Sequence, residues 1–85
     1  SARFGLDIEK IEQHIDKKLN DTDRKVLFEL LKDPVISNKE IAKKVCLSIE
    51  GVGSSLRRMY VYFNIKESKY KKISLLLDAV RLSNN

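Results

Sequence analysis

The chain has 85 residues, of which 42% are hydrophobic, and it carries a net charge of +5. A chain of this length forms one small domain with a modest core, so a second fold is excluded. Its single cysteine, Cys46, has no partner for an internal disulfide, and no Cys/His pair has metal-ligand spacing. We therefore expect a reducing compartment, the cytoplasm, and neither a metal nor another cofactor.

Membrane insertion and secretion are not expected either. No stretch approaches the roughly 18 consecutive apolar residues that a membrane span needs. The first residues, SARFGLDIEK, lack the apolar region of a signal peptide. They also lack an initiator Met, and from this we expect a domain that belongs to a longer protein.

The positive charge is concentrated in one segment. Residues 43–72 hold eight basic side chains and two acidic ones. A clustered positive surface attracts polyanions, and nucleic acid is the leading partner. A surface that only keeps the chain soluble is the alternative.

Residues that could assemble a catalytic site are missing. One histidine, one cysteine and no carboxylate pair in an apolar setting leave no nucleophile with an acid or base beside it, so we expect that the chain is not an enzyme. A protein-interaction or oligomerisation module remains an alternative, because Tyr60, Tyr62 and Tyr70 lie beside basic residues and could form a docking surface. Affinity that falls steeply with salt would favour DNA, since phosphate contacts release counterions.

The first predicted element lies in residues 1–19. Phe4, Ile8, Ile11 and Ile15 are spaced by four, three and four residues, which predicts one face of a helix of about a dozen residues. This linker helix either packs back on the domain or continues a longer dimerising linker.

Two further helices are predicted between residues 20 and 46. Asn20 is an N-cap for a helix over about 21–32, which Asp33-Pro34 ends because proline disfavours helical geometry in the residue before it. Ser37 and Glu40 predict a capping box that opens a short helix over about 38–45. The predicted core residues of the two helices are Val26, Leu27, Leu30, Leu31, Ile41, Ala42 and Val45.

The fourth and fifth helices follow a turn at residues 46–48. Ser48 is the N-cap of a helix over about 49–63, and Asn64 fits a left-handed position at its end. Its inward face is predicted from Val52, Leu56, Met59 and Phe63, and its outward face from Glu50, Ser54, Arg57 and Val61. The last helix, over about 70–82, has an apolar stripe of Ile73, Leu76, Leu77 and Val80.

Two helices joined by a three-residue turn are typical of the helix-turn-helix, whose second helix enters the major groove of DNA. We expect Gly51, Gly53, Ser54 and Ser55 to allow close approach of the backbone, although Gly51 could instead make room for a neighbouring helix. The arginines can reach guanine or phosphate. The predicted base-facing residues are Gly53, Ser54, Arg57 and Arg58.

The run SNKEIA at residues 37–42 is preceded by Leu19, Asp23 and Val26-Leu27 and followed by Leu47, Ser48 and Val52. In this order the residues resemble the LuxR/GerE-type tetrahelical DNA-binding domain, the C-terminal effector domain of bacterial transcriptional regulators. The resemblance covers Leu19 to about Leu82. The later run SLRRMYVYFNIKESKYKKI resembles regulators of this family from Bacteroidetes.

The resemblance implies that Lys43 and Lys44 meet phosphates and that positions 53, 54 and 57 face bases. It also places a dimer contact on the last helix, for which we predict Leu75 and Leu82. Departures from the family are Gly51 for the usual Thr, Gly53 for Lys and Ser55 for a frequent His, and they leave the preferred DNA sequence open. The complete set of predicted phosphate contacts is Lys39, Lys43, Lys44, Lys66 and Lys69.

The sequence therefore predicts an all-α fold: a tetrahelical helix-turn-helix bundle over residues 20–85 with an additional N-terminal linker helix over residues 1–19. The predicted function is sequence-specific binding of double-stranded DNA by a homodimer on a two-fold site, under the control of an upstream sensor or receiver domain. A winged-helix domain is the structural alternative, because YVYFNI and YKKISLLL could form a hairpin around KESK.

Overall fold

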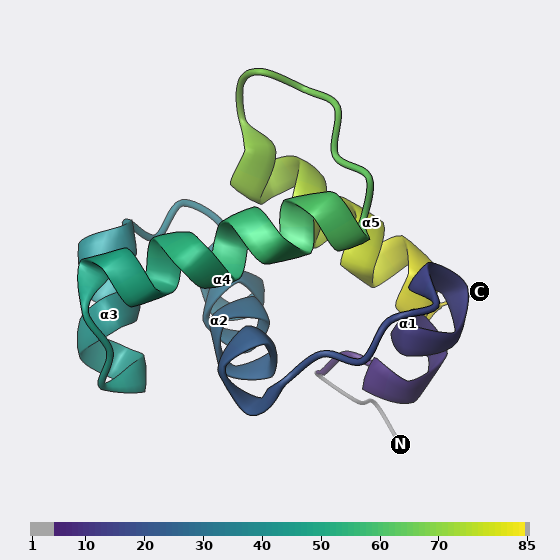
Figure 1. Ribbon diagram of the computed structural model, residues 1–85, viewed down its shortest axis with the longest axis horizontal. Helices are drawn as coiled ribbons and strands as arrows, with labels where there is room; N and C mark the ends of the chain where they lie inside the picture. Colours follow the sequence, from purple (N-terminus) through teal and green to yellow (C-terminus); the bar gives the residue numbers. More distant parts are fainter. Residues whose placement is uncertain (1–4, 85) are drawn as a thin grey trace.

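The computed structural model describes residues 5–84 and confirms the all-α class, with five helices and no strand in that range. The helices are α1 (Ile8–Ile15), α2 (Asp21–Lys32), α3 (Asn38–Val45), α4 (Ile49–Tyr62) and α5 (Lys71–Ser83) (Figure 1). Phe4 lies outside the described residues. None of the described helices is both long enough and apolar enough to cross a membrane.

The helix ends follow local signals in the sequence. The Asn20 side chain accepts a hydrogen bond from the Asp23 amide, and Asp23 accepts one from the Asn20 amide, so α2 opens with a full capping box. Ser37 caps α3 by accepting from the Glu40 amide at 3.1 Å. The reciprocal half of the box predicted there does not form in the described structure, where the Glu40 carboxylate lies 3.6 Å from Lys43 Nζ.

The turn between α3 and α4 has the predicted position. Cys46 adopts a left-handed conformation with φ of 57°, and Ser48 then caps α4 by accepting from the Gly51 amide at 3.0 Å. At the far end of α4, Asn64 is also left-handed, as predicted. The chain then arches away from the bundle before it enters α5 (Figure 1). Residues that could have formed a wing instead complete α4 and build α5.

The core draws on every helix, and α1 belongs to it. Ile11 is fully buried, and the backbone amide of Asp7 donates to Ser83 Oγ at 2.7 Å, which ties the start of α1 to the end of α5. Figure 1 shows α1 beside the C-terminal part of α5. Of the two predicted arrangements of the N-terminal helix, the described residues therefore adopt the one that packs back on the domain.

The buried face of α5 differs from the predicted stripe. Leu75 is 0% exposed and joins Leu76 and Ala79 in the core, whereas Leu77 is 63% exposed. The prediction of Leu75 as a dimer contact is therefore wrong, because a surface contact cannot use a side chain that the monomer already buries. Leu82 is half-buried and packs against the core. Leucines at 75, 76 and 77 allow more than one helical stripe, and contacts with α1, α2 and α4 select the one that is buried.

We expect Leu75→Ala to lower the free energy of unfolding by about 2–5 kcal/mol, because it leaves a cavity in the core. Leu77→Ala, on the same helix, should change it by less than about 0.5 kcal/mol because that side chain already meets solvent. Urea unfolding followed by circular dichroism compares the two variants. Equal stability of both variants would contradict the buried position of Leu75.

Candidate nucleic-acid interface

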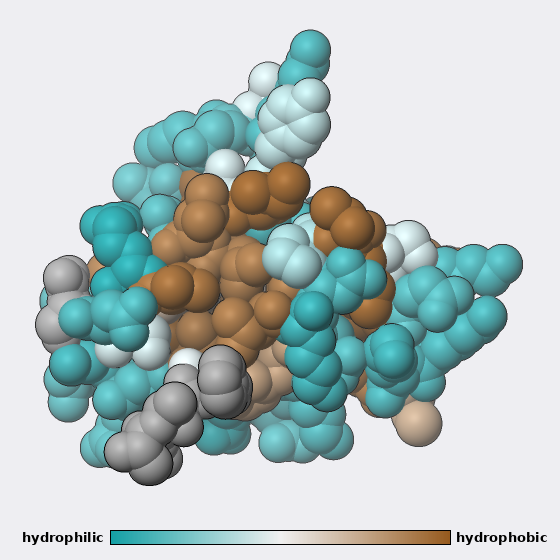
Figure 2. All heavy atoms as spheres, turned by 180° about the vertical axis from the view of Figure 1, so that it is seen from behind, coloured by the Kyte–Doolittle hydropathy of each residue, from teal (hydrophilic) through white to brown (hydrophobic). Residues whose placement is uncertain are grey.

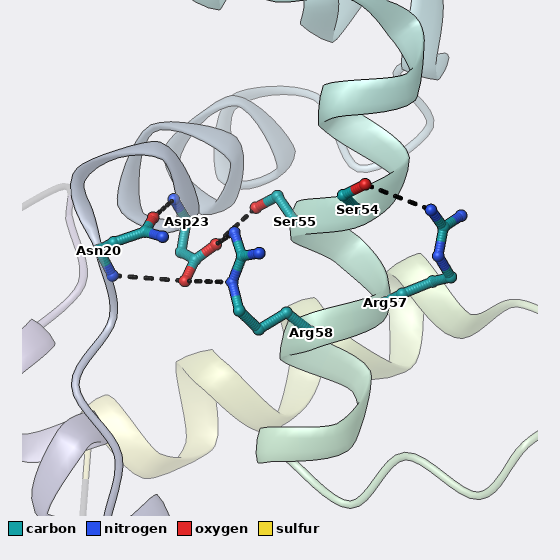
Figure 3. A network of polar contacts seen from close by, with 6 residues as sticks. All are labelled: Asn20, Asp23, Ser54, Ser55, Arg57 and Arg58. Carbon is teal, nitrogen blue, oxygen red and sulfur yellow. Dashed lines mark hydrogen bonds and ion pairs between the residues drawn. The ribbon is translucent and has the colours of Figure 1, made fainter.

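Helix α4 presents different side chains to the core and to its flanks. Val52, Leu56, Met59 and Phe63 are buried, as predicted from their spacing. Figure 3 shows Ser55 and Arg58 projecting from α4 toward Asp23 on α2, whereas Ser54 and Arg57 project from another side of the helix. Two adjacent serines and two adjacent arginines are thus divided between two faces.

The face toward α2 is built around Asp23, which is 1% exposed. Its Oδ1 accepts from Ser55 Oγ at 2.7 Å and from Arg58 Nη2 at 2.6 Å, and its Oδ2 accepts from Arg58 Nε at 3.3 Å. A charge in this setting is tolerated only when it is paired and hydrogen-bonded. The hydrogen bond to Asp23 is also the main cause that raises the pKa of the Arg58 guanidinium.

These contacts change the roles expected for two residues. Ser55 is fully buried, so its small side chain serves packing and the bond to Asp23, not close approach of DNA. The Arg58 guanidinium lies on Asp23, away from the side of α4 where Ser54 and Arg57 project (Figure 3). The structure thus does not bring Arg58 together with the other three predicted base-facing residues.

Gly53, Ser54 and Arg57 do lie together. Arg57 Nη2 donates to Ser54 Oγ at 3.3 Å, and the guanidinium folds back along the helix over Gly53. A Cβ added at Gly53 would lie 3.2 Å from Arg57 Nη1, so a larger residue there would displace the guanidinium. A Cβ at Gly51 would instead meet Ser48 Oγ at 3.3 Å and Leu47 Cβ at 3.7 Å, and both atoms belong to the turn. Gly51 therefore relieves crowding within the turn, not against another helix.

All five lysines predicted to meet phosphates are exposed. Lys39, Lys43 and Lys44 lie on α3, which packs against α4. The ion pair of Lys43 with Glu40 joins two exposed side chains and contributes little to stability. Lys66 and Lys69 lie in the loop between α4 and α5.

Two neighbouring lysines at the start of α5 have unlike surroundings. Lys72 Nζ donates to Ile36 O at 2.7 Å and to Asn38 Oδ1 at 3.0 Å, and burial lowers the pKa of its amine. It ties α5 to the start of α3. Lys71 is exposed, and its Nζ lies 5.5 Å from the centre of the Tyr60 ring. Neither lysine has a predicted role beyond its place in the basic segment, because spacing alone does not tell the anchored lysine from the exposed one.

Comparison with known families agrees with the helix-turn-helix. Residues 19–59 match the model of a family described as winged helix-turn-helix DNA-binding. The match covers α2, α3 and most of α4, just under half of the chain. No curated protein and no solved structure shows detectable similarity to the chain. The fold and this match support a DNA-binding helix-turn-helix domain with double-stranded DNA as its partner; the resemblance to the LuxR/GerE family is not confirmed.

The adjacent arginines make a matched pair for a stability test. Arg58→Met should lower the free energy of unfolding by about 1–3 kcal/mol, because Asp23 would stay buried without its charged partner. Arg57→Met should change it by less than about 0.5 kcal/mol, since Arg57 is exposed. Thermal and urea unfolding measure both. A loss at Arg57 as large as that at Arg58 would show that the two faces of α4 are assigned wrongly.

Proposed function

We propose that this domain is the DNA-binding output domain of a bacterial transcriptional regulator and that α4 enters the major groove. The observation that carries the proposal is the outer face of α4, where Ser54 and Arg57 project, on a helix that packs against α3 and its exposed lysines. Polar and basic side chains on that face can reach base edges without burying unpaired apolar surface. An upstream sensor or receiver domain would control when α4 meets DNA.

The tetrahelical LuxR/GerE arrangement is part of the proposal. Its support is that α5 occupies the part of the chain where a winged domain would have a hairpin, together with the SNKEIA run at residues 37–42. The domain would then present α3 and α4 to DNA and use α5 for other contacts. Ile11 of α1 is buried in the same core as Leu19, which precedes α2. Through this shared core α1 would transmit the signal of the upstream domain to the DNA-binding helices.

Arg57 and Ser54 would contact the base edges. An arginine held in the major groove can donate two hydrogen bonds to guanine O6 and N7. Gly53 leaves room for the guanidinium to fold toward the N-terminal half of α4, which is the part of a recognition helix that meets bases. Arg58 and Ser55 hold α4 on α2 and would contribute through its orientation. Lys39, Lys43, Lys44, Lys66 and Lys69 would neutralise phosphates.

Pairing of two copies would supply affinity that one recognition helix lacks. A monomer with few cationic contacts is expected at the weak, non-specific end of roughly 10⁻⁴–10⁻⁶ M. Figure 2 shows apolar side chains gathered in the middle of the face behind α4, over α5. Ile73 and Leu77 of α5 are exposed, and Leu77 projects most. We propose that Leu77, in place of Leu75, lies at the contact between two copies on a two-fold site.

Fluorescence anisotropy with labelled duplexes tests the proposed function. Selection from a random DNA pool should enrich a two-fold sequence, and the observed binding constant should fall linearly with salt on logarithmic axes. Affinity that does not vary with salt, or selection that enriches no sequence, would favour a protein-interaction module instead.

We expect Arg57→Ala to weaken binding to the selected sequence by about 1–3 kcal/mol and to relax preference at one base pair. Lys44→Ala should weaken binding to selected and random duplexes alike and lower the salt slope by about one unit. Binding curves on both duplexes separate the two effects. A uniform loss with Arg57→Ala would remove that residue from base reading.

Leu77→Glu should leave the helical content and half-site binding unchanged and abolish cooperative binding to the full two-fold site. The charge would lie in an apolar contact between copies, where nothing pairs with it. Footprinting on half and full sites measures the cooperativity. Gln13→Glu, at an exposed position of α1, is a control that adds the same single negative charge. Full cooperativity of Leu77→Glu would exclude Leu77 from the contact.

A further inference from the structure

A shallow hollow of about 460 Å³ lies where α4 ends and the arching loop begins. Arg57 of α4, Lys66 of the loop and Lys71 of α5 line it together with Tyr60, Val61, Asn64 and Ile65. The hollow is continuous with the proposed base-reading face, because Arg57 belongs to both. All of its lining residues except Arg57 lie beyond the residues that match the winged helix-turn-helix family, which end at Met59.

The charge of the hollow is wholly positive. Among the described residues that line it, three are cationic and none is acidic. Within residues 5–84, Arg57, Lys66 and Lys71 form no ion pair, whereas Lys18, Lys25, Lys32 and Arg81 each have a carboxylate within 4 Å. Three neighbouring cations without a counter-charge repel one another and attract an anion.

The residues that line the hollow also place apolar surface beside the cations, which suits an anion that has an apolar part. Tyr60, Val61 and Ile65 supply apolar surface beside the cations, and Val61 is 77% exposed. Lys71 Nζ is held 5.5 Å from the centre of the Tyr60 ring, a cation–π distance that keeps the amine beside this apolar surface. A sugar can rest on the apolar part while its phosphate meets the amines.

We propose that this hollow binds a deoxyribose-phosphate of the DNA backbone beside the stretch of groove that α4 reads. The inference rests on the proposed function and extends it to the loop after α4 and the start of α5. The loop between α4 and α5 thereby takes the place of a wing: it reaches the backbone with two lysines and needs no strands. Such a contact positions the domain and increases affinity without reading sequence.

The test uses the double variant Lys66→Ala/Lys71→Ala. Both side chains are exposed, so the thermal unfolding midpoint should stay unchanged. Affinity for selected and random duplexes should fall alike, by roughly tenfold, and the salt slope should drop by about one unit for the lost phosphate. Hydroxyl-radical footprinting should lose protection at backbone positions flanking the bases that Arg57 reads.

Two matched variants make the result specific. Lys18→Ala/Lys32→Ala removes the same charge from exposed lysines that already pair with Glu12 and Glu29, and it should keep the wild-type slope and footprint. Lys66→Arg/Lys71→Arg keeps the cations and should bind nearly as the wild type does.

Failure of the inference differs from failure of the proposed function. If the wild type binds duplex DNA and the Lys66→Ala/Lys71→Ala variant keeps its salt slope and flanking protection, the hollow does not hold the DNA backbone and the inference is wrong, whereas the proposed function stands. If the wild type itself shows no salt-dependent binding to any duplex, both the inference and the proposed function are wrong.

Discussion

The orientation of α4 depends on one buried carboxylate. Asp23 completes the capping box of α2 and also accepts hydrogen bonds from Ser55 and Arg58 of α4, so the same two oxygens cap α2 and hold α4. Moving a charge from water into the core is costly unless hydrogen bonds compensate for the lost hydration. Among the described residues, no buried polar side-chain atom lacks a hydrogen-bond partner. A shift of α4 along α2 would break three hydrogen bonds at once. This geometry fixes which side of α4 faces outward.

The division of α4 into two faces follows from that constraint. One arginine of the adjacent pair is held by α2 and the other is left on the outer face with Ser54 and Gly53. The outer face is therefore small. In the proposed function, the domain gains further affinity from contacts with the DNA backbone and from pairing of two copies. In the proposed function, the basic segment between residues 43 and 72 supplies the contacts with the DNA backbone, because its exposed lysines lie on both sides of α4 in the sequence.

Because α5 follows the helix-turn-helix, this domain differs in shape from a winged helix-turn-helix domain. Its inner face closes the core against α1, α2 and α4, and its first turn is tied to α3 through Lys72. The loop before it arches away from the bundle and brings Lys66 toward the end of α4 (Figure 1). In the proposed function the loop and α4 meet DNA, and Figure 2 shows apolar side chains gathered on the face behind α4.

The sequence by itself determined α2, α3 and α4 and the ends of these helices. Asn20, Ser37 and Ser48 cap by local hydrogen bonds, Pro34 stops α2, and apolar spacing defined the inner face of α4, because these signals act within a few residues. Only the tertiary structure decided the roles of neighbours that look alike. Arg57 and Arg58, Lys71 and Lys72, and Leu75 and Leu77 each share a residue type, so what separates them is the distant group that each meets: Asp23 for Arg58, Ile36 O for Lys72 and the core for Leu75.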